Sequence, residues 1–327
     1  MTEEEKPLTR EDVLKMIEEH GGPEGLDLSK KNLKGIDLSS DEPGEALDLR
    51  GIILEGANLQ EANLRFINLQ GASLLRANLQ GADLWGAELQ EAKLQYSNLH
   101  GAGLWYANLQ GASLTLANLQ GAFLSHANLQ GAFLWGAKLH GTKLWGARLS
   151  KASLMRVEIS RETMLEGVDW GPKYILHEEE EGRFRAAAED YCILRRWHTE
   201  AGMYDIAGEF YFREMTVRRK DLKWWPNLLP RAWSEVLAIL CGYGEKPFRV
   251  VISAAVVVFG LAAIYSASAL TFLQSLYYST VSFTALGYGF WVSDPVGWVK
   301  GLGAFEASIG VFMMALFLIT FVRKMTR

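Results

Sequence analysis

Leucine recurs at a fixed interval of five residues through the middle of the chain. Every fifth residue from Leu49 to Leu154 is leucine, and Ile159 and Met164 are expected to keep the phase. A period of five fits neither the 3.6-residue helix nor the two-residue strand, so the pattern predicts a coil whose straight sides are five residues long. Each residue of the series is expected to face the interior of that coil.

The positions around each leucine follow a pattern of their own. A small residue, most often alanine, stands two positions before it, and glycine recurs two positions after it, at the predicted corners. The repeat resembles that of four-sided pentapeptide-repeat coils, in which twenty residues complete one turn, so Trp85, Trp105 and Trp145 are expected to stack in an aromatic ridge. The ridge would either pack against the protein's own helices or form an interface with a partner.

The repeat resembles the pentapeptide-repeat family, A-(N/D)-L-x-x, over roughly residues 30 to 166. The resemblance implies a right-handed quadrilateral β-helix, which we expect over residues 26–170. Repeat rods need capped ends. Thr9, at the start of an amphipathic run that ends in two glycines, predicts a capping helix within residues 1–25.

Residues 171–248 are expected to form an α-helical linker on the cytoplasmic side. They predict a helical hairpin followed by a shorter helix. Trp224, Trp225 and Trp233 accompany several leucines there, a composition suited to the headgroup layer of a membrane. The shorter helix therefore either lies along the inner leaflet or is an ordinary amphipathic helix buried on the hairpin.

Residues 249–327 are much poorer in charge than the rest of the chain. Residues 250–270 are uncharged and long enough to cross a membrane, and a second apolar stretch runs from about Trp298 to Val322. Basic residues before the first stretch and after the second place both ends of the chain in the cytoplasm. We expect an all-α two-helix domain of a multi-pass protein in the prokaryotic plasma (inner) membrane.

The segment between the two spans carries the candidate functional site. It is too apolar for an external loop and too short for a further span, so it is expected to dip into the membrane and return, beginning with a short helix over 271–283. Non-helical backbone at membrane depth is tolerated only where it is buried in protein or lines an aqueous path. The segment therefore predicts a re-entrant pore loop.

The tip of this loop resembles the T-x-G-Y-G filter of two-helix potassium channels, and the resemblance covers residues 249–327. It implies that K⁺, the permeant ion, binds to rings of backbone carbonyls from residues 284–288, and that a homotetramer completes each ring. Ala285 and Phe290 stand where the family usually has threonine and aspartate, which leaves a weakly selective cation pore as the alternative. The expected filter residues are Thr284, Ala285, Leu286, Gly287, Tyr288 and Gly289.

The same resemblance assigns roles to residues around the filter. Tyr277 and Tyr278 are expected to support it. Gly310 stands at the position of the gating hinge in the second helix. Met314 and Leu318, one and two turns further on, would line the inner pore and close it as an apolar constriction.

Glu306 is the energetically unfavourable residue of the second span, because a carboxyl group inside a membrane needs a hydrogen-bonding partner or a functional reason. We expect a hydrogen bond to the short helix, at Thr280 or Ser282, through which Glu306 supports the filter. The alternative is a charge that faces the cavity and concentrates cations.

The composition and the motif content argue against several other functions. The net charge of −5, from 33 basic and 38 acidic residues, offers no basic face for nucleic acid, and the nearly balanced charge of the repeats does not favour a DNA mimic. Two cysteines form no disulfide framework, and the acidic start MTEEEKP is not a secretory leader. With no nucleophile, metal or phosphate-loop motif, neither an enzyme nor an organic cofactor is expected.

These observations predict a tetrameric potassium-selective channel whose cytoplasmic pentapeptide-repeat domain regulates gating or assembly. The chain ends five residues after Val322, so cytosolic control is expected from the N-terminal side. The alternatives are a weakly selective cation channel and a membrane-anchored scaffold with a non-conducting pore. The expected partners are further copies of the chain and the lipid bilayer, and a cytosolic partner or ligand on the β-helix is left open.

Overall fold

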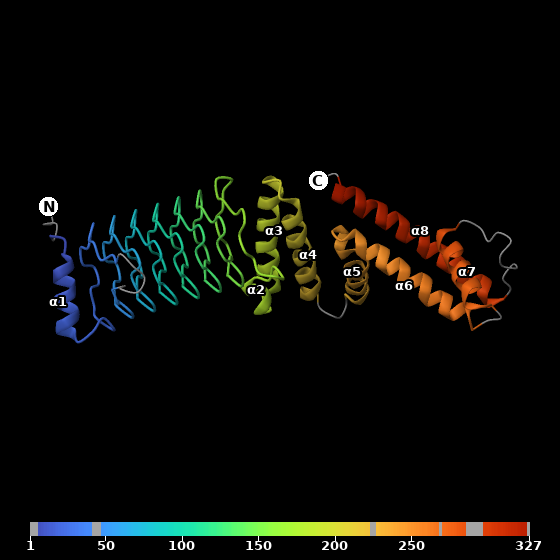
Figure 1. Cartoon of the computed structure of the whole chain (residues 1–327), viewed down its shortest axis with the longest axis horizontal. Helices are drawn as coiled ribbons and strands as arrows, with labels where there is room; N and C mark the ends of the chain where they lie inside the picture. The colour runs from blue at the N-terminus through green and yellow to red at the C-terminus, as the bar shows by residue number, and fades with distance from the viewer. Residues whose placement is uncertain (1–5, 41–46, 223–226, 268–269, 286–296, 326–327) are drawn as a thin grey trace. The chain divides into compact units, whose positions relative to one another are not determined.

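The protein divides into two compact units, Met1–Gly202 and Met203–Arg327. The computed structural model describes residues 6–40, 47–222, 227–267, 270–285 and 297–325 (Figure 1). The boundary between the units falls between the two helices that the sequence analysis placed in one hairpin. The first unit holds the repeats, and the second holds both apolar helices.

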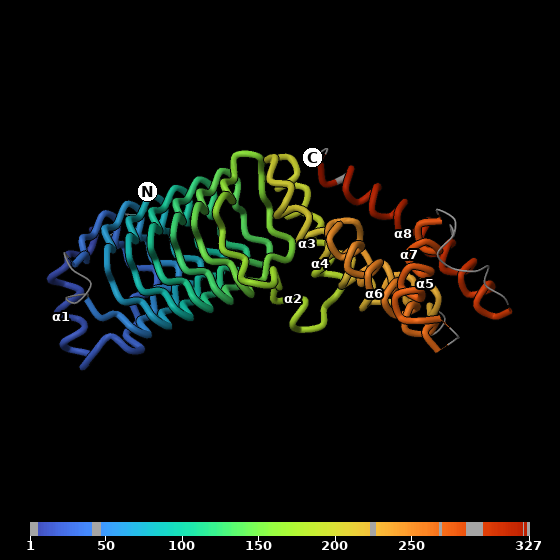
Figure 2. Tube along the Cα trace, turned by 45° about the vertical axis from the view of Figure 1, so that its right-hand side comes forward, coloured from blue at the N-terminus to red at the C-terminus, as the bar shows by residue number. Residues whose placement is uncertain are grey.

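The repeats wind into a coil of short parallel β-bridges, in which each turn lies over the next (Figure 2). From Asp48 paired with Asn68 to Lys138 paired with Glu158, each bridge joins residues twenty apart, so one turn takes four pentads. The leucines of the five-residue series from Leu49 to Leu154 are at most 6% exposed, which confirms the predicted inward series. Burial of one leucine contributes about 2 kcal/mol. The handedness and the square outline of the coil stay predictions.

The five-residue phase breaks near the end of the coil. Lys143 pairs with Met164 and Arg148 with Asp169, so one extra residue enters the last turn. Met164 is 45% exposed, whereas Leu165 is only 2% exposed. The prediction that Met164 keeps the phase is therefore wrong, because the extra residue moves the inward position to Leu165.

One edge of the coil carries a ladder of aromatic rings. Successive members contact one another with ring centroids 4.6–6.3 Å apart. Three members are corner residues with positive φ, so the corners are not reserved for glycine. The ladder consists of Phe66, Trp85, Tyr106, His126 and Trp145.

Trp105, the middle member of the predicted ridge, lies outside this ladder. Its ring covers Gly103, where a Cβ atom would come within 2.5 Å of it, and stacks on Phe123 with ring centroids 4.5 Å apart. The predicted stack of three tryptophans is therefore wrong. The rings find partners on the coil itself, since the missing side chain of Gly103 opens a place for Trp105.

A helix covers each end of the coil. Helix α1 (Arg10–His20) begins with a capping box between Thr9 and Asp12, and Gly21 ends it in the left-handed conformation, which confirms the predicted capping helix. Helices α2 (His177–Glu180) and α3 (Phe184–Glu200) follow the last turn. The Trp197 indole of α3 donates to the Ser160 carbonyl at 3.1 Å.

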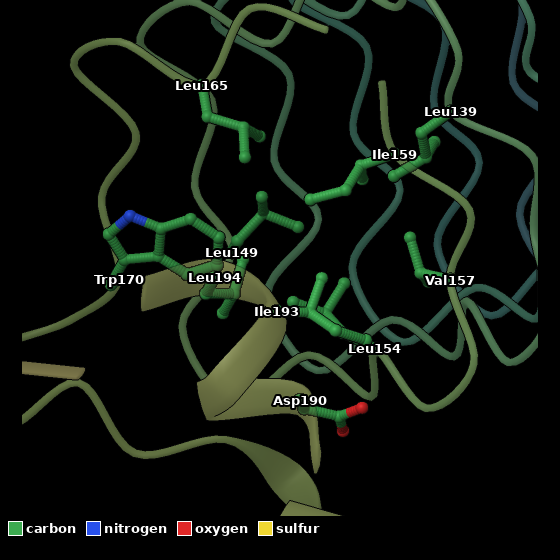
Figure 3. Close-up of a pocket in the computed structure, with 10 residues that line it drawn as sticks. All are labelled: Leu139, Leu149, Leu154, Val157, Ile159, Leu165, Trp170, Asp190, Ile193 and Leu194. Carbon is green, nitrogen blue, oxygen red and sulfur yellow. The ribbon is translucent and has the colours of Figure 1, made fainter. Parts of the chain in front are cut away.

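Apolar side chains of α3 and of the last turns line a small cavity, with Asp190 at its margin (Figure 3). Asp190 and Glu178 are 2% and 0% exposed. Burial, and next the neighbouring Glu178 carboxyl, raise the pKa of Asp190 to about 8. Burial also lowers the pKa of His198, on the same helix, to about 4. The cover of the coil therefore contains two groups that are neutral at pH 7.

The second unit consists of helices. Among its described residues, two helices are long and apolar enough to cross a membrane, over Pro247–Tyr265 and Trp298–Val322. The first ends five residues before the predicted limit of residue 270. The helices are α4 (Tyr204–Asp221), α5 (Leu228–Cys241), the 3₁₀ turn η2 (Gly242–Gly244), α6 (Pro247–Tyr265), α7 (Phe272–Thr284) and α8 (Trp298–Met325).

Helix α5 is amphipathic, with one face packed and one exposed. Leu237 and Leu240 pack in a cluster with Val250 of α6. Ile239 on the other face is 61% exposed, and Leu229 in the first turn is 83% exposed. One face of α5 is therefore covered by the second unit, while position along a leaflet stays a prediction. Trp224 and Trp225 lie outside the described residues.

Candidate ion-conduction site

Helix α7 is the short helix that the sequence predicts between the two spans. Its N-terminus is fixed by a capping box, in which Thr271 and the Gln274 side chain satisfy each other's backbone N–H groups. The helix ends at Ala285, whose φ of 56° is left-handed and whose N–H donates to the Ser282 carbonyl. The expected helix over 271–283 is thus confirmed as Phe272–Thr284.

The structure places only the first two expected filter residues. Thr284 is the last residue of α7, and Ala285 caps it. Leu286, Gly287, Tyr288 and Gly289 lie outside the described residues, as does Phe290. Coordination of K⁺ by the carbonyls of this segment stays a prediction.

Glu306 joins the three helices of this site. It is 0% exposed. The Tyr265 hydroxyl of α6 donates to Glu306 Oε2 at 2.8 Å, and Ser279 of α7 contacts Oε1. The α7 partner is therefore Ser279, next to the expected Thr280, and the carboxyl group does not face a cavity.

The number of hydrogens available for hydrogen bonds at this site indicates whether the Glu306 carboxyl group is protonated. The Ser279 hydroxyl lies 2.8 Å from the Val258 carbonyl as well as against Glu306, yet it has one hydrogen to donate. If Glu306 Oε1 carries a proton and donates it to Ser279, then Ser279 donates to Val258 and Tyr265 donates to Oε2. Every donor then has an acceptor, and no net charge is buried among apolar helices. The geometry therefore favours the neutral acid.

The two tyrosines of α7 lie in the same region. Tyr278 is fully buried, its hydroxyl donates to the Val299 carbonyl of α8 at 3.2 Å, and its ring meets Tyr265 edge-on at 4.8 Å. Tyr277 packs against the same cluster. These contacts brace α7 against both spans, and support of the filter itself stays a prediction.

Gly310 of α8 lies directly against the end of α7. A Cβ atom on Gly310 would fall 1.7 Å from the Phe283 carbonyl oxygen, so no other residue fits without movement of the backbone. Met314 and Leu318 are 44% and 61% exposed in the single chain. They are thus turned away from the other helices of the second unit, as an inner-pore position requires.

Helix α4 holds the ends of both spans. Asp205 pairs with Lys324 near the end of α8, and Glu209 pairs with Lys246, just before α6, at 3.1 Å. Phe212 lies under the cationic groups of Lys246 and Arg249. The acidic residues are four apart and share one face of α4. In the described parts of the chain, no cluster of histidine, cysteine, aspartate or glutamate could hold a metal.

Sequence reasoning missed Tyr265 and Ser279, although a usable signal was present. Both are polar residues within or at the end of largely apolar helices, where a polar group needs a partner. The sequence named the carboxyl group that needed partners, but not which turn of each helix faces it. That depends on how α6, α7 and α8 pack.

Comparison with protein families identifies both parts of the chain. The family model for pentapeptide repeats (8 copies) matches residues 45–74, 72–104, 97–136 and 117–155. The family model for the ion channel matches residues 251–327. The chain therefore joins a stretch of pentapeptide repeats to a stretch that matches the ion channel family, and two of its described helices are long and apolar enough to cross a membrane.

Solved structures similar to this chain include three described here. QnrB1, a plasmid-mediated fluoroquinolone resistance protein, is 19% identical over 48% of this chain and 80% of its own, with a TM-score of 0.34. HetL from Nostoc sp. strain PCC 7120, a pentapeptide repeat protein involved in heterocyst differentiation regulation, is 26% identical over 50% and 94%, with a TM-score of 0.19. Rfr23 from Cyanothece 51142, a pentapeptide repeat protein, is 30% identical over 46% and 87%, with a TM-score of 0.21. The comparison with curated proteins gave no match.

Proposed function

We propose that the chain is one subunit of a homotetrameric potassium-selective channel in a prokaryotic plasma membrane, with both ends in the cytoplasm. The match of residues 251–327 to the ion channel family carries this proposal. The resemblance of residues 284–289 to the T-x-G-Y-G filter indicates that K⁺ is the conducted ion. Four copies would surround the axis, with K⁺ on the filter carbonyls and with Met314 and Leu318 at the inner mouth.

In this proposal the repeats form a right-handed, four-sided cytoplasmic coil that regulates gating or assembly through α4. Helix α4 begins two residues after Gly202, the last residue of the first unit. Its acidic residues hold Lys246 and Lys324, which lie near the expected cytoplasmic ends of both spans. A displacement of α4 would therefore act on α6 and α8 together.

Ion flux into liposomes that contain the purified full-length protein tests the proposal. We expect uptake driven by a K⁺ gradient, little uptake with Na⁺ in its place, and none for Gly287→Asp, which puts a side chain and a charge at a filter glycine. Equal K⁺ and Na⁺ flux would instead establish a weakly selective cation channel. Absence of flux for both ions, from a protein that assembles normally, would support the scaffold.

A further inference from the structure

Two of the contacts between helices α7 and α8 lie one helical turn apart on each helix. Ser279 of α7 contacts Glu306 of α8, and the Phe283 carbonyl of α7 meets Gly310 of α8. Residues four apart lie on the same face of a helix, so the two contacts are neighbours along the surface where α7 packs on α8. We call each of these two contacts a rung. The pairing fixes both the distance and the register between α7 and α8.

The rung at Gly310 depends on the absence of a side chain. With a Cβ atom 1.7 Å from the Phe283 oxygen, the helices would have to separate by roughly 2 Å to restore an ordinary van der Waals distance. The Phe283 side chain is fixed as well, since it is buried with Met313 and Val250. The carbonyl belongs to the last turn of α7, where it has no acceptor role inside the helix, and the next residue is Thr284.

We propose that Gly310 is a positioning residue for ion selectivity, because it seats the C-terminal end of α7 directly on α8 and so sets the position of Thr284. The inference rests on the proposed channel function, in which Thr284 opens the filter. It gives a glycine at this position a role different from that of a hinge. A hinge lets α8 bend at Gly310, whereas a seat keeps α8 and the end of α7 together.

Two glycine variants of the full-length protein separate these roles. Gly310→Ala adds the clashing Cβ atom, and Gly301→Ala is the matched control, since a Cβ atom on Gly301 of the same helix meets nothing within 4 Å. We expect Gly310→Ala to lower the K⁺/Na⁺ flux ratio by about tenfold, equivalent to about 1.4 kcal/mol of lost discrimination. Gly301→Ala should keep the wild-type ratio. Reduced flux of Gly310→Ala with an unchanged ratio would support a hinge and overturn the proposal.

A second pair of variants, which remove a hydroxyl group instead of adding a clashing atom, tests the proposal if Gly310→Ala does not assemble. Ser279→Ala loosens the other rung, while Ser308→Ala removes only a hydroxyl that bonds to Ala304 within α8. The proposal expects a lower K⁺/Na⁺ ratio for Ser279→Ala and no change for Ser308→Ala. Equal ratios for these two variants would overturn it.

Amide hydrogen exchange over residues 272–285 gives a readout that needs no ion selectivity. The proposal expects faster exchange at the end of α7 in Gly310→Ala and in Ser279→Ala, but not in the two controls. Unchanged exchange would overturn the seat, even in a conducting protein. A wild-type protein that passes Na⁺ as readily as K⁺ would overturn the potassium proposal instead, and exchange would still decide whether the seat exists.

Discussion

Glu306 is a buried residue whose role depends on whether its carboxyl group is charged. A charge facing the cavity and a neutral hydrogen-bonded acid were both compatible with its place in the sequence. In the structure it is fully buried, and both carboxyl oxygens contact hydroxyl groups of neighbouring helices. These contacts favour a structural node that holds α6, α7 and α8 together.

Substitution of Glu306 by glutamine separates the two roles. Glutamine keeps one acceptor for Tyr265 and one donor for Ser279, so we expect Glu306→Gln to assemble and conduct like the wild type. Glu306→Ala leaves both hydroxyl groups without this partner and should destabilise the assembly by about 2–4 kcal/mol. Thermal melting in detergent and flux in liposomes measure the two effects. A large loss of conductance in a stable, normally assembled Glu306→Gln protein would show that a charge is needed.

Asp190 predicts how the stability of the first unit depends on pH. The folded protein holds the Asp190 proton up to about pH 8, whereas the unfolded chain releases it near 3.8, so raising the pH between these values favours unfolding. His198 acts in the opposite direction from its folded pKa of about 4 up to 6.5, where only the unfolded chain is protonated. The two effects oppose each other below pH 6.5, and Asp190 acts alone from there to pH 8.

We therefore expect the free energy of unfolding to fall by about 1 kcal/mol per pH unit between pH 7 and pH 8, where the opposing His198 effect has faded, and to level off beyond pH 8. Asp190→Asn should remove this decline, while Glu189→Gln, a change at the exposed neighbour, should keep it. Urea unfolding of the full-length protein, followed by circular dichroism at pH 6.5, 7.25 and 8, measures the slope. Parallel slopes in the wild type and Asp190→Asn would contradict the assignment.

At the scale of elements, the last turn of the coil shows how one extra residue changes which side chain is buried. Leu165 has replaced Met164 at the inward position. We expect Leu165→Ala to cost about 2–4 kcal/mol of stability and Met164→Ala less than 1 kcal/mol, because only the first leaves a cavity. Urea unfolding of the two variants compares them. Similar losses would mean that the five-residue phase continues to Met164.

The regular elements could be predicted because their signals are local. The leucine period predicted the interior of the coil, and Thr9 predicted the start of α1, where the structure has a capping box. The period alone could not show the extra residue before Leu165, because an insertion leaves apolar residues at both candidate positions. It could not orient Trp105 either, since that ring turns toward the space left by Gly103.

The candidate site was predictable in its parts but not in its contacts. The sequence identified Glu306, Gly310 and the tyrosines of α7 as unusual residues. It could not give Ser279, Tyr265 or the Phe283 carbonyl as their partners, because these pairs join residues 21 or more positions apart through the packing of three helices. The role of Gly310 changes most, since glycine serves both bending and close approach of two backbones.

At the scale of the whole molecule, the chain combines a repeat domain with an ion channel domain. The two differ in where their stability comes from. The coil buries a continuous row of leucines and alanines, whereas the described apolar helices keep large side chains exposed, as expected for surfaces that face lipid or further subunits. A single chain therefore completes the interior of the coil, whereas it leaves the described apolar helices partly uncovered.

The reversal potential of the full-length protein in a planar bilayer, with K⁺ on one side and Na⁺ on the other, tests the central claim most directly. A potassium-selective pore predicts a current that reverses far from zero, close to the value set by K⁺ alone, and no current for Gly287→Asp. A reversal potential at zero with robust current would contradict potassium selectivity.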